Sequence, residues 1–327
     1  MKIIVPSVEI MRTGLEKGYI TPEKHIEKVG RTCYKSEDKI TDDSAAKFVS
    51  GLINRGHEAM IEHFSLIFKT NEFTYEEMAE DYEMLMHNID IDLTEPLRPY
   101  LRFTDQQMSD GEQRCIVSAN MRAWRCFVGA CVEGYGFIPQ YLHGIVRCHS
   151  LFFPEFQAYV PSIIYNDKLI PIAVSELTES ERWVHQDITV KFTCDRGVSH
   201  EIVRHRVASF AQESTRYCNY GLDKFGNEIT VIRPSWCKEE DDIYKVWRDG
   251  CILAEGAYFS MLSENATPQE ARSVLPNSLK TEVIVTMNLA NWDHFFELRC
   301  ARDAHPDIQE VAKMARDMFY VEKVYSV

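Results

Sequence analysis

Residues 204–217 read RHRVASFAQESTRY, and the interpretation of the whole chain starts from them. Three arginines, one histidine, two serines and one tyrosine fall in this stretch of a 327-residue chain whose net charge is -14. With 45% hydrophobic and 26% charged residues, the composition is that of a globular protein long enough for one large domain or two ordinary ones. Its acidic balance disfavours general binding of nucleic acid or anionic membranes. A local basic cluster in such a chain predicts a small anionic ligand.

The start of the chain and its cysteines predict a compartment. The opening MKIIVPSVEI has no charged segment followed by an apolar one, and no apolar run in the sequence is long enough to span a bilayer. The 10 cysteines have no framework-like spacing, so we expect reduced thiols. The sequence therefore predicts a soluble, cytoplasmic protein.

The basic stretch follows a predicted strand and a short predicted helix. DITVKFTCDRG (187–197) alternates apolar and polar residues, and SHEIVRHRV (199–207) is typical of a helix that runs into a loop. Two helical positions two apart point about 200° away from each other, so Arg204 and Arg206 would serve two ligands or two parts of one long ligand. Arg216 lies in the loop, where hydroxyls and backbone N–H groups can hold phosphate oxygens. An exposed ion-pair face is the alternative, but Ser209, Ser214 and Tyr217 nearby make it less attractive.

A second arginine signal lies near the C-terminus. Trp292, Phe296 and Arg299 are spaced as i, i+4 and i+7, which places a guanidinium on an otherwise apolar helical stripe. A buried guanidinium without a partner is costly. Arg299 therefore faces either an acidic side chain or a negatively charged ligand, and the sequence favours neither.

Other chemistry is weakly supported. His57 and His63 in HEAMIEH match neither H-E-x-x-H nor H-x-x-E-H, so we predict no metal site. Neither dinucleotide nor nucleotide glycine-rich loops occur. Cys218 has only His205 as a nearby candidate base and is interpreted as an ordinary thiol.

The rest of the sequence predicts helices and strands on either side of a middle segment, residues 70–189, whose composition differs. Residues 44–56 predict a helix with Ser44 as a possible N-cap, and residues 64–69 predict a strand. Two further helices are expected over 241–265 and 267–275, and two more within 291–319, the second of which begins at Pro306. One spacing recurs: Asn120, Trp124 and Phe127 repeat as Asn288, Trp292 and Phe295. Three matching positions favour chance over duplication.

Arg204-His205-Arg206, followed after seven residues by Ser214, resembles the R-H-R-x7-S signature of the flavin-dependent thymidylate synthases. GRTCYKS (30–36), RGHEAMIEH (55–63), EARSVLP (270–276) and FFELRCARDAH (295–305) occur in the order found in that family. The resemblance covers residues 1–69 and 190–327 as a core, and 70–189 looks like an insertion packed on it. It implies an α+β fold with a small antiparallel sheet packed with helices, plus a mostly helical insertion.

The resemblance also implies an activity. Members methylate dUMP to dTMP: NADPH reduces the bound FAD, and methylenetetrahydrofolate supplies the carbon. A homotetramer with active sites shared between subunits is expected. Two alternatives remain open: a flavin-dependent hydroxymethylase acting on a pyrimidine nucleotide, and a catalytically silent flavin- or nucleotide-binding protein whose insertion docks a partner.

Site residues carry over by position. Arg299 looks like the arginine that favours ionisation of the uracil, and Ser214 like a residue that positions the substrate rather than a covalent nucleophile. The implied dUMP contacts are Glu201, Arg204, Gln212, Glu213, Ser214, Thr215, Arg216, Arg272 and Arg299. The implied FAD contacts are His57, Arg204, His205, Arg206, Gln212, Asn288 and His294.

The sequence departs from the family at five of these or neighbouring positions: Ala59, Glu201, Ala211, Gln212 and Ala290. A carboxylate at Glu201 beside a phosphate or uracil is unfavourable without a cationic partner, and Arg204 and Arg272 are the candidates. These departures bear on substrate identity more than on flavin binding.

Overall fold

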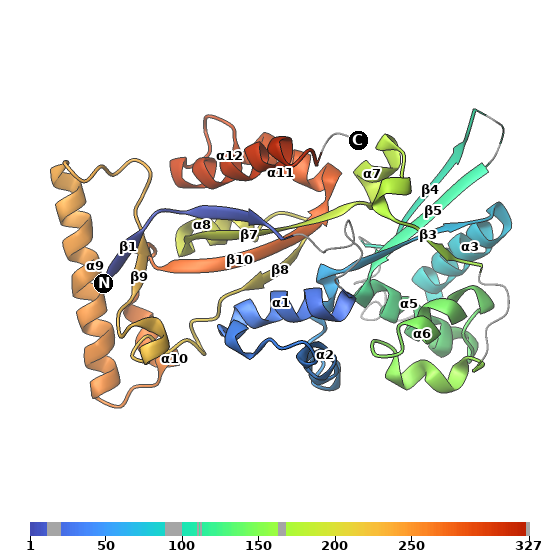
Figure 1. Ribbon diagram of the computed structural model, residues 1–327, viewed down its shortest axis with the longest axis horizontal. Helices are drawn as coiled ribbons and strands as arrows, with labels where there is room; N and C mark the ends of the chain where they lie inside the picture. Colours follow the sequence, from blue (N-terminus) through green and yellow to red (C-terminus); the bar gives the residue numbers. More distant parts are fainter. Residues whose placement is uncertain (12–20, 89–99, 110, 112, 163–167, 325–327) are drawn as a thin grey trace.

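The structure, a computed structural model, describes residues 1–11, 21–88, 100–109, 111, 113–162 and 168–324 (Figure 1). Helices surround two four-stranded antiparallel sheets and a two-stranded parallel pair. The α+β class expected from the sequence is confirmed.

The first sheet has the order β2-β7-β10-β8, with every neighbouring pair antiparallel. Its members are β2 (Ser7–Ile10), β7 (Asp187–Asp195), β8 (Ser209–Gln212) and β10 (Lys280–Asn288). Val190 and Phe192 of β7 are fully buried, as the predicted alternation requires. The strand predicted at 187–197 is therefore confirmed.

Helices cover both faces of this sheet (Figure 1). α11 (Leu289–Arg299) and α12 (Pro306–Val321) pack on one face, where Trp292 and Phe319 are buried with Val283 of β10. α1 (Pro22–Tyr34) and α2 (Ser44–Asn54) lie on the other side, where Val29 contacts the next strand residue, Ile284. Successive strand residues point to opposite faces, so one strand anchors both layers.

The helix predicted over 44–56 is present, but its N-cap is Asp43 rather than Ser44. The hydroxyl of Ser44 accepts a hydrogen bond from the Thr41 N–H and donates one to Glu27. Gly56 follows the helix with φ of 68°, a conformation that glycine adopts without strain.

The second sheet has the order β4-β5-β3-β6 and is also antiparallel. Its members are β3 (Ser65–Thr70), β4 (Arg102–Gln107), β5 (Gln113–Asn120) and β6 (Ile170–Pro171). α3 (Glu72–Asn88) follows β3, and α5 (Met121–Tyr135) follows β5. The sheet thus joins a strand of the predicted core to three strands of the predicted insertion, and the division of the chain at 69 and 190 stays a prediction.

The remaining elements connect these layers. They are β1 (Lys2–Ile4), α6 (His143–Cys148), α7 (Glu179–His185), α8 (Arg196–Ile202), β9 (Thr230–Ile232), α9 (Asp242–Ser263) and α10 (Pro268–Ala271), with short 3-10 turns such as η3 (Glu58–His63) and η8 (Arg272–Val274). Over the described ranges, no helix is long and apolar enough to cross a membrane. All ten cysteines are free thiols.

Candidate active site

The R-H-R triplet lies in a loop rather than on a helix. The Asp195 side chain caps α8 by accepting from the Val198 N–H at 2.7 Å, and α8 ends at Ile202. The expected helix over 199–207 therefore stops before Arg204, and the opposite directions inferred for two helical arginines do not apply. Asn291 of α11 anchors the loop by donating to the Val207 carbonyl at 3.1 Å.

Arg299, at the end of α11, faces an acidic side chain. Its Nη1 donates to Glu201 Oε2 at 2.9 Å, and its Nη2 donates to the Glu201 carbonyl at 3.2 Å. Its Nε donates to His205 Nε2 at 2.8 Å. An acidic side chain therefore faces Arg299, as one of the two alternatives required. The prediction that Arg204 or Arg272 would be the cationic partner of Glu201 is wrong, because Arg299 has that role.

His205 is held as a neutral acceptor. A guanidinium only donates, so Nε2 of His205 carries the lone pair and its proton resides on Nδ1. The ring is buried and lies 4.8 Å from the Phe295 ring centroid in an edge contact. Burial, with the positive charge of Arg299 and the proximity of His294, lowers the pKa of His205 to about 4. His205 therefore stays uncharged at neutral pH beside Arg299.

The end of β8 is tied to α8 and to β10. The Gln212 amide donates to Ser199 at 2.8 Å and to Thr281 at 3.2 Å. Ser199 lies two residues before Glu201, the residue of α8 that binds Arg299. Gln212 thereby connects the expected dUMP loop to the same helix that carries Glu201.

Glu213 is buried in a charge network. Its carboxylate lies 2.8 Å from Lys280, which also contacts Glu282 at 2.8 Å. Lys35 completes the network at 2.6 Å from Glu282 and 3.9 Å from Glu213. Burial alone would raise the pKa of Glu282, but the two lysines lower it to about 2. The side chain of Glu213 is thus committed to Lys280.

Sequence reasoning did not assign roles to Lys35 and Lys280. A signal existed in GRTCYKS, which the structure brings against the loop after β8. The Ser214 N–H donates to the Cys33 carbonyl at 3.0 Å, and the Tyr34 and Tyr217 rings are 5.4 Å apart. The spacing of the motif along α1 explains why these residues reach the loop together.

Thr215, Arg216 and Arg272 form a second group beyond β8. Arg272 Nη1 donates to the Thr215 hydroxyl at 3.2 Å, and Arg216 Nε donates to Gln269 of α10 at 3.1 Å. Arg216 also lies 5.8 Å from the Tyr217 ring. These contacts hold the two arginines at the edge of the loop that carries Ser214.

Four expected anion-binding arginines stand without an acidic partner in the described part of the chain. Among the residues that the structure describes, no carboxylate forms an ion pair with Arg204, Arg206, Arg216 or Arg272, and all four side chains are exposed. Arg206 donates to the carbonyls of Val203 and His205, so its described partners are neutral. Uncompensated guanidinium groups fit phosphate or pyrophosphate ligands.

Three expected flavin contacts lie apart from these groups. Asn288 caps α11 by accepting from the Asn291 N–H at 3.0 Å, and its amide donates to the Val184 carbonyl at 3.0 Å. His294 is exposed on α11, 3.6 Å from Glu297. His57 is exposed at the start of η3. His294 lies near enough to His205 to lower its pKa, whereas no hydrogen bond or ion pair among the described residues joins His57 or Asn288 directly to Arg299.

Cys218 is buried next to this loop and is not poised as a nucleophile. Burial and the charge of Glu213 raise the pKa of its thiol to about 12. A thiol with such a pKa stays protonated at neutral pH. The interpretation of Cys218 as an ordinary thiol therefore agrees with its surroundings.

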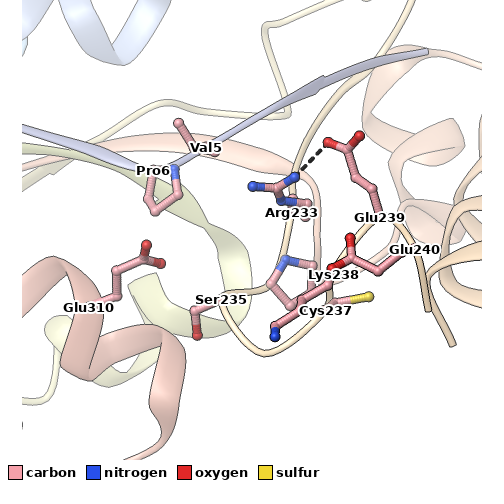
Figure 2. Close-up of a pocket in the computed structure, with 10 residues that line it drawn as sticks. Val5, Pro6, Arg233, Ser235, Cys237, Lys238, Glu239, Glu240 and Glu310 are labelled. Atoms are coloured by element: carbon pink, nitrogen blue, oxygen red, sulfur yellow. Dashed lines mark hydrogen bonds and ion pairs between the residues drawn. The ribbon is translucent and has the colours of Figure 1, made fainter.

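A cavity of about 300 Å³ lies elsewhere, between the start of the chain and the segment after β9 (Figure 2). Arg233 and Lys238 face it together with Glu240 and Glu310, and Arg233 pairs with Glu239 at 2.6 Å. Figure 2 shows both signs of charge around the opening. The cavity contains none of the expected site residues.

Comparison with known proteins gives a family match over about half of the chain. Residues 166–322 match the family model described as "Thymidylate synthase complementing protein". The match contains R-H-R, Ser214, Arg272 and Arg299, and it begins inside the segment 70–189. The resemblance expected from the motifs is confirmed over this range.

Curated relatives carry the name "Flavin-dependent thymidylate synthase". The protein of Pyrococcus furiosus is 37% identical over 126 residues, which is 38% of this chain and 51% of the relative. That of Pyrococcus abyssi is 34% identical over 119 residues, 36% of this chain and 48% of the relative. That of Sulfurisphaera tokodaii is 36% identical over 132 residues, 40% of this chain and 48% of the relative. The chain spans about half the length of the curated relatives it matches.

Proposed function

We propose that the chain is a flavin-dependent thymidylate synthase that methylates dUMP to dTMP with FAD, NADPH and methylenetetrahydrofolate. The observation that carries the proposal is the contact of the R-H-R loop with Arg299, through His205, in the region that matches the family. Two motifs 94 residues apart in sequence meet there at 2.8 Å. An ion pair between Arg299 and Glu201 alone would not require the neutral His205 as a further acceptor for the same guanidinium.

Arg299 is the proposed catalytic residue. A guanidinium has five N–H donors, and the contacts to Glu201 and His205 use three of them. The remaining donors can bind a uracil oxygen or nitrogen. Positive charge in a water-poor site stabilises a developing uracil anion. Glu201 and His205 are the proposed positioning residues, because both hold the guanidinium from the protein side.

The phosphates are assigned to the exposed arginines. We assign the dUMP phosphate to the loop around Ser214, with Gln212, Glu213 and Thr215 shaping that loop and Arg204, Arg216 and Arg272 binding. FAD is assigned to Arg204, His205, Arg206, Gln212, His57, Asn288 and His294. The fit rests on the absence of acidic partners for these arginines among the described residues. When bound, FAD supplies hydride chemistry that no side chain offers.

The assembly, the compartment and the division of the chain extend the proposal. A homotetramer and a core of 1–69 and 190–327 with an insertion at 70–189 rest on the family resemblance. A reducing compartment, the cytoplasm, is supported by ten free thiols, seven of which are buried. Light scattering coupled to gel filtration measures the assembly directly.

The test is the mass of the product. The purified chain is incubated without oxygen with FAD, NADPH, methylenetetrahydrofolate and dUMP, and the nucleotide is analysed by mass spectrometry. A methyl gain supports the proposal. A hydroxymethyl gain would assign the hydroxymethylase reaction, and an unchanged nucleotide with bound FAD would assign a silent binding protein.

Matched variants separate the proposed role of Arg299 from a general loss of charge. Arg299→Ala should slow methyl transfer by about a hundredfold or more, the scale of a lost electrostatic donor. Arg302→Ala should not slow it, because Arg302 is exposed just beyond α11. Equal loss in both variants would contradict the assigned role.

A further inference from the structure

The two four-stranded sheets have the same construction. Read from the matching edge, they are β2-β7-β10-β8 and β6-β3-β5-β4, and all neighbours are antiparallel. β10 leads into α11 through Asn288, which accepts from the N–H three residues later at 3.0 Å. β5 leads into α5 through Asn120, which accepts from the N–H three residues later at 2.8 Å. The repeated Trp and Phe that follow are fully buried in both helices.

The registers of the two sheets coincide. Ser65 lies opposite Asn120, and Asp187 lies opposite Asn288, so Ser65 corresponds to Asp187. Counting on from these positions, Lys69 corresponds to Lys191.

The edge strands obey this correspondence. Lys69 lies opposite Ile170 of β6, and Lys191 lies opposite Glu9 of β2. The next contacts match as well: the Ile172 N–H donates to the Ile67 carbonyl at 3.1 Å, and the Met11 N–H donates to the Thr189 carbonyl at 2.8 Å. A shared spacing of three residues has thus become a shared register over four strands.

We define repeat 1 as residues 7–135 and repeat 2 as residues 170–299. Each repeat gives its first strand to the other's sheet, because β2 lies on β7 and β6 lies on β3. A pair of hydrogen bonds is exchanged in the same way. His63 Nδ1 lies 2.7 Å from Thr286 Oγ1, and His185 Nδ1 lies 2.7 Å from Ser118 Oγ. His63 corresponds to His185 and Ser118 to Thr286, so equivalent atoms meet twice.

The two junctions between the repeats differ in chemistry. At one, Glu62 of repeat 1 accepts from Ser209 at 3.0 Å, directly after the R-H-R loop. Tyr100 of repeat 1 donates to the Ala208 carbonyl at 3.0 Å. At the other, Arg102 donates to the Val184 carbonyl at 2.9 Å and binds Asp187 at 2.7 Å. An ion pair between the two repeats thus occupies the second junction, whereas at the first junction Glu62 pairs with Arg122 of its own repeat at 2.5 Å.

The family motifs are also found at one junction and not at the other. Counted by register, positions 214 and 299 of repeat 2 carry Ser and Arg, and their counterparts in repeat 1 are Gln107 and Cys131. His57 and Glu62 of repeat 1 correspond to Glu179 and Val184 of repeat 2. The first junction therefore brings together HEAMIEH of repeat 1 and R-H-R-x7-S of repeat 2. The second junction contains neither motif.

We propose that the chain is an internal pair of two copies of one folding unit, with one ligand site per chain built from both repeats. Segment 57–63 of repeat 1 and loop 203–214 of repeat 2 form that site, and the related junction binds no ligand. The expected insertion at 70–189 then supplies the second half of repeat 1, residues 70–135, and the start of repeat 2, residues 170–189. The proposal rests on the proposed function only for its choice of ligands, FAD and dUMP.

Ligand stoichiometry tests the single site. The full chain is titrated with FAD in the presence of dUMP, and bound flavin is counted per chain by absorbance. One FAD per chain is expected, and two would overturn the proposal. If no FAD binds, both the proposed function and the composite flavin site are refuted. The internal pair of repeats is then tested by the double-mutant cycles on the exchanged hydrogen bonds.

Matched variants at corresponding positions test the origin of the site. Ser214→Ala and His57→Ala should each weaken dUMP or FAD binding at least about tenfold, the scale of a lost ligand hydrogen bond. Gln107→Ala and Glu179→Ala, at exposed counterpart positions, should change binding less than twofold. Equal weakening by a residue and its counterpart, or no effect of His57→Ala, would overturn the composite site.

The exchanged hydrogen bonds test the pair without any ligand. Double-mutant cycles combine His63→Ala with Thr286→Val, and His185→Ala with Ser118→Ala, in the full chain. Both cycles should give non-additive shifts in Tm of similar size. Additive shifts in either cycle would overturn the reciprocal arrangement.

Discussion

Two strand–helix units, β10–α11 and β5–α5, share the residues that pack them, which we call their frame. They differ in the residue near the end of the helix. Both have an asparagine cap and a fully buried tryptophan four residues later. At the eleventh residue after the asparagine, α11 carries Arg299, which binds Glu201, while α5 carries Cys131, which is fully buried. The difference teaches that the residues that pack these units and the residues proposed to bind ligand are separate sets.

The shared frame should be equally necessary in both units, and this is the largest effect we expect. Trp124→Ala and Trp292→Ala each remove a fully buried indole and should each reduce the free energy of unfolding by about 3–5 kcal/mol. Urea denaturation followed by circular dichroism measures both. A small loss for Trp124→Ala alone would show that the first unit does not support the fold.

Replacing the residue at the end of α11 should affect the rate of the proposed reaction much more than the free energy of unfolding. Arg299→Ala should reduce the rate of methyl transfer by about a hundredfold to a thousandfold, the scale of a lost electrostatic donor. The free energy of unfolding should change less than in the tryptophan variants, because Arg299 lies at the end of α11 and is 21% exposed. Single-turnover kinetics and urea denaturation provide the two measurements. A loss of stability as large as that of Trp292→Ala would contradict this separation.

His63 and His185, which form the exchanged hydrogen bonds between the repeats, should make the free energy of unfolding depend on pH. Burial and the neighbouring His25 lower the pKa of His63 to about 3, and burial with Arg102 lowers that of His185 to about 4. Below the ordinary value of about 6.5, the unfolded chain takes up protons that the folded chain does not. Stability is therefore complete above pH 6.5 and falls toward pH 4. At pH 5 each histidine should cost at most about 2 kcal/mol.

Urea midpoints between pH 7 and pH 5 measure this loss. His63→Asn and His185→Asn should each flatten the pH dependence, and the exposed His294→Asn should leave it unchanged. An equally steep profile in all three variants would assign the loss to other groups.

The smallest expected effect distinguishes the two tryptophans. Trp292 Nε1 donates to the Ile188 carbonyl at 3.0 Å, whereas Trp124 Nε1 is buried without a partner among the described residues. Trp292→Phe should therefore cost about 1 kcal/mol more than Trp124→Phe, because only the first change removes a hydrogen bond. Paired urea curves measure the difference, and equal costs would show that the hydrogen bond adds nothing net.

Individual helices and strands could be predicted from the sequence where the spacing of apolar residues was regular. The spacing of apolar residues located α2 and α12, and alternation located β3 and β7. The stripe of Trp292 and Phe296 correctly marked Arg299 as a buried-side arginine that needs a partner. The motifs R-H-R-x7-S and FFELRCARDAH correctly marked two segments that meet.

Partners far apart in sequence could not be predicted. Glu201 and Arg299 are separated by 98 residues, and periodicity does not identify contacts across that distance. Alternation in β3 shows which side chains are buried but not that β5 and β6 are its neighbours. The end of α8 before Arg204 was also missed, because the residues of the triplet are compatible with a helix until its tertiary contacts are known.

The exchange of edge strands also sets an order for folding during synthesis. β2 contains residues 7–10, and its partners on β7 are residues 190–193. The ribosome therefore releases the first strand long before its partner exists, and so distant a pairing closes slowly. Val8 and Ile10 must wait unpaired, so nascent chains arrested before β7 should leave the N-terminus open to protease and those arrested after β10 should protect it. Equal cleavage of both would show that β2 is held by something other than its strand partner.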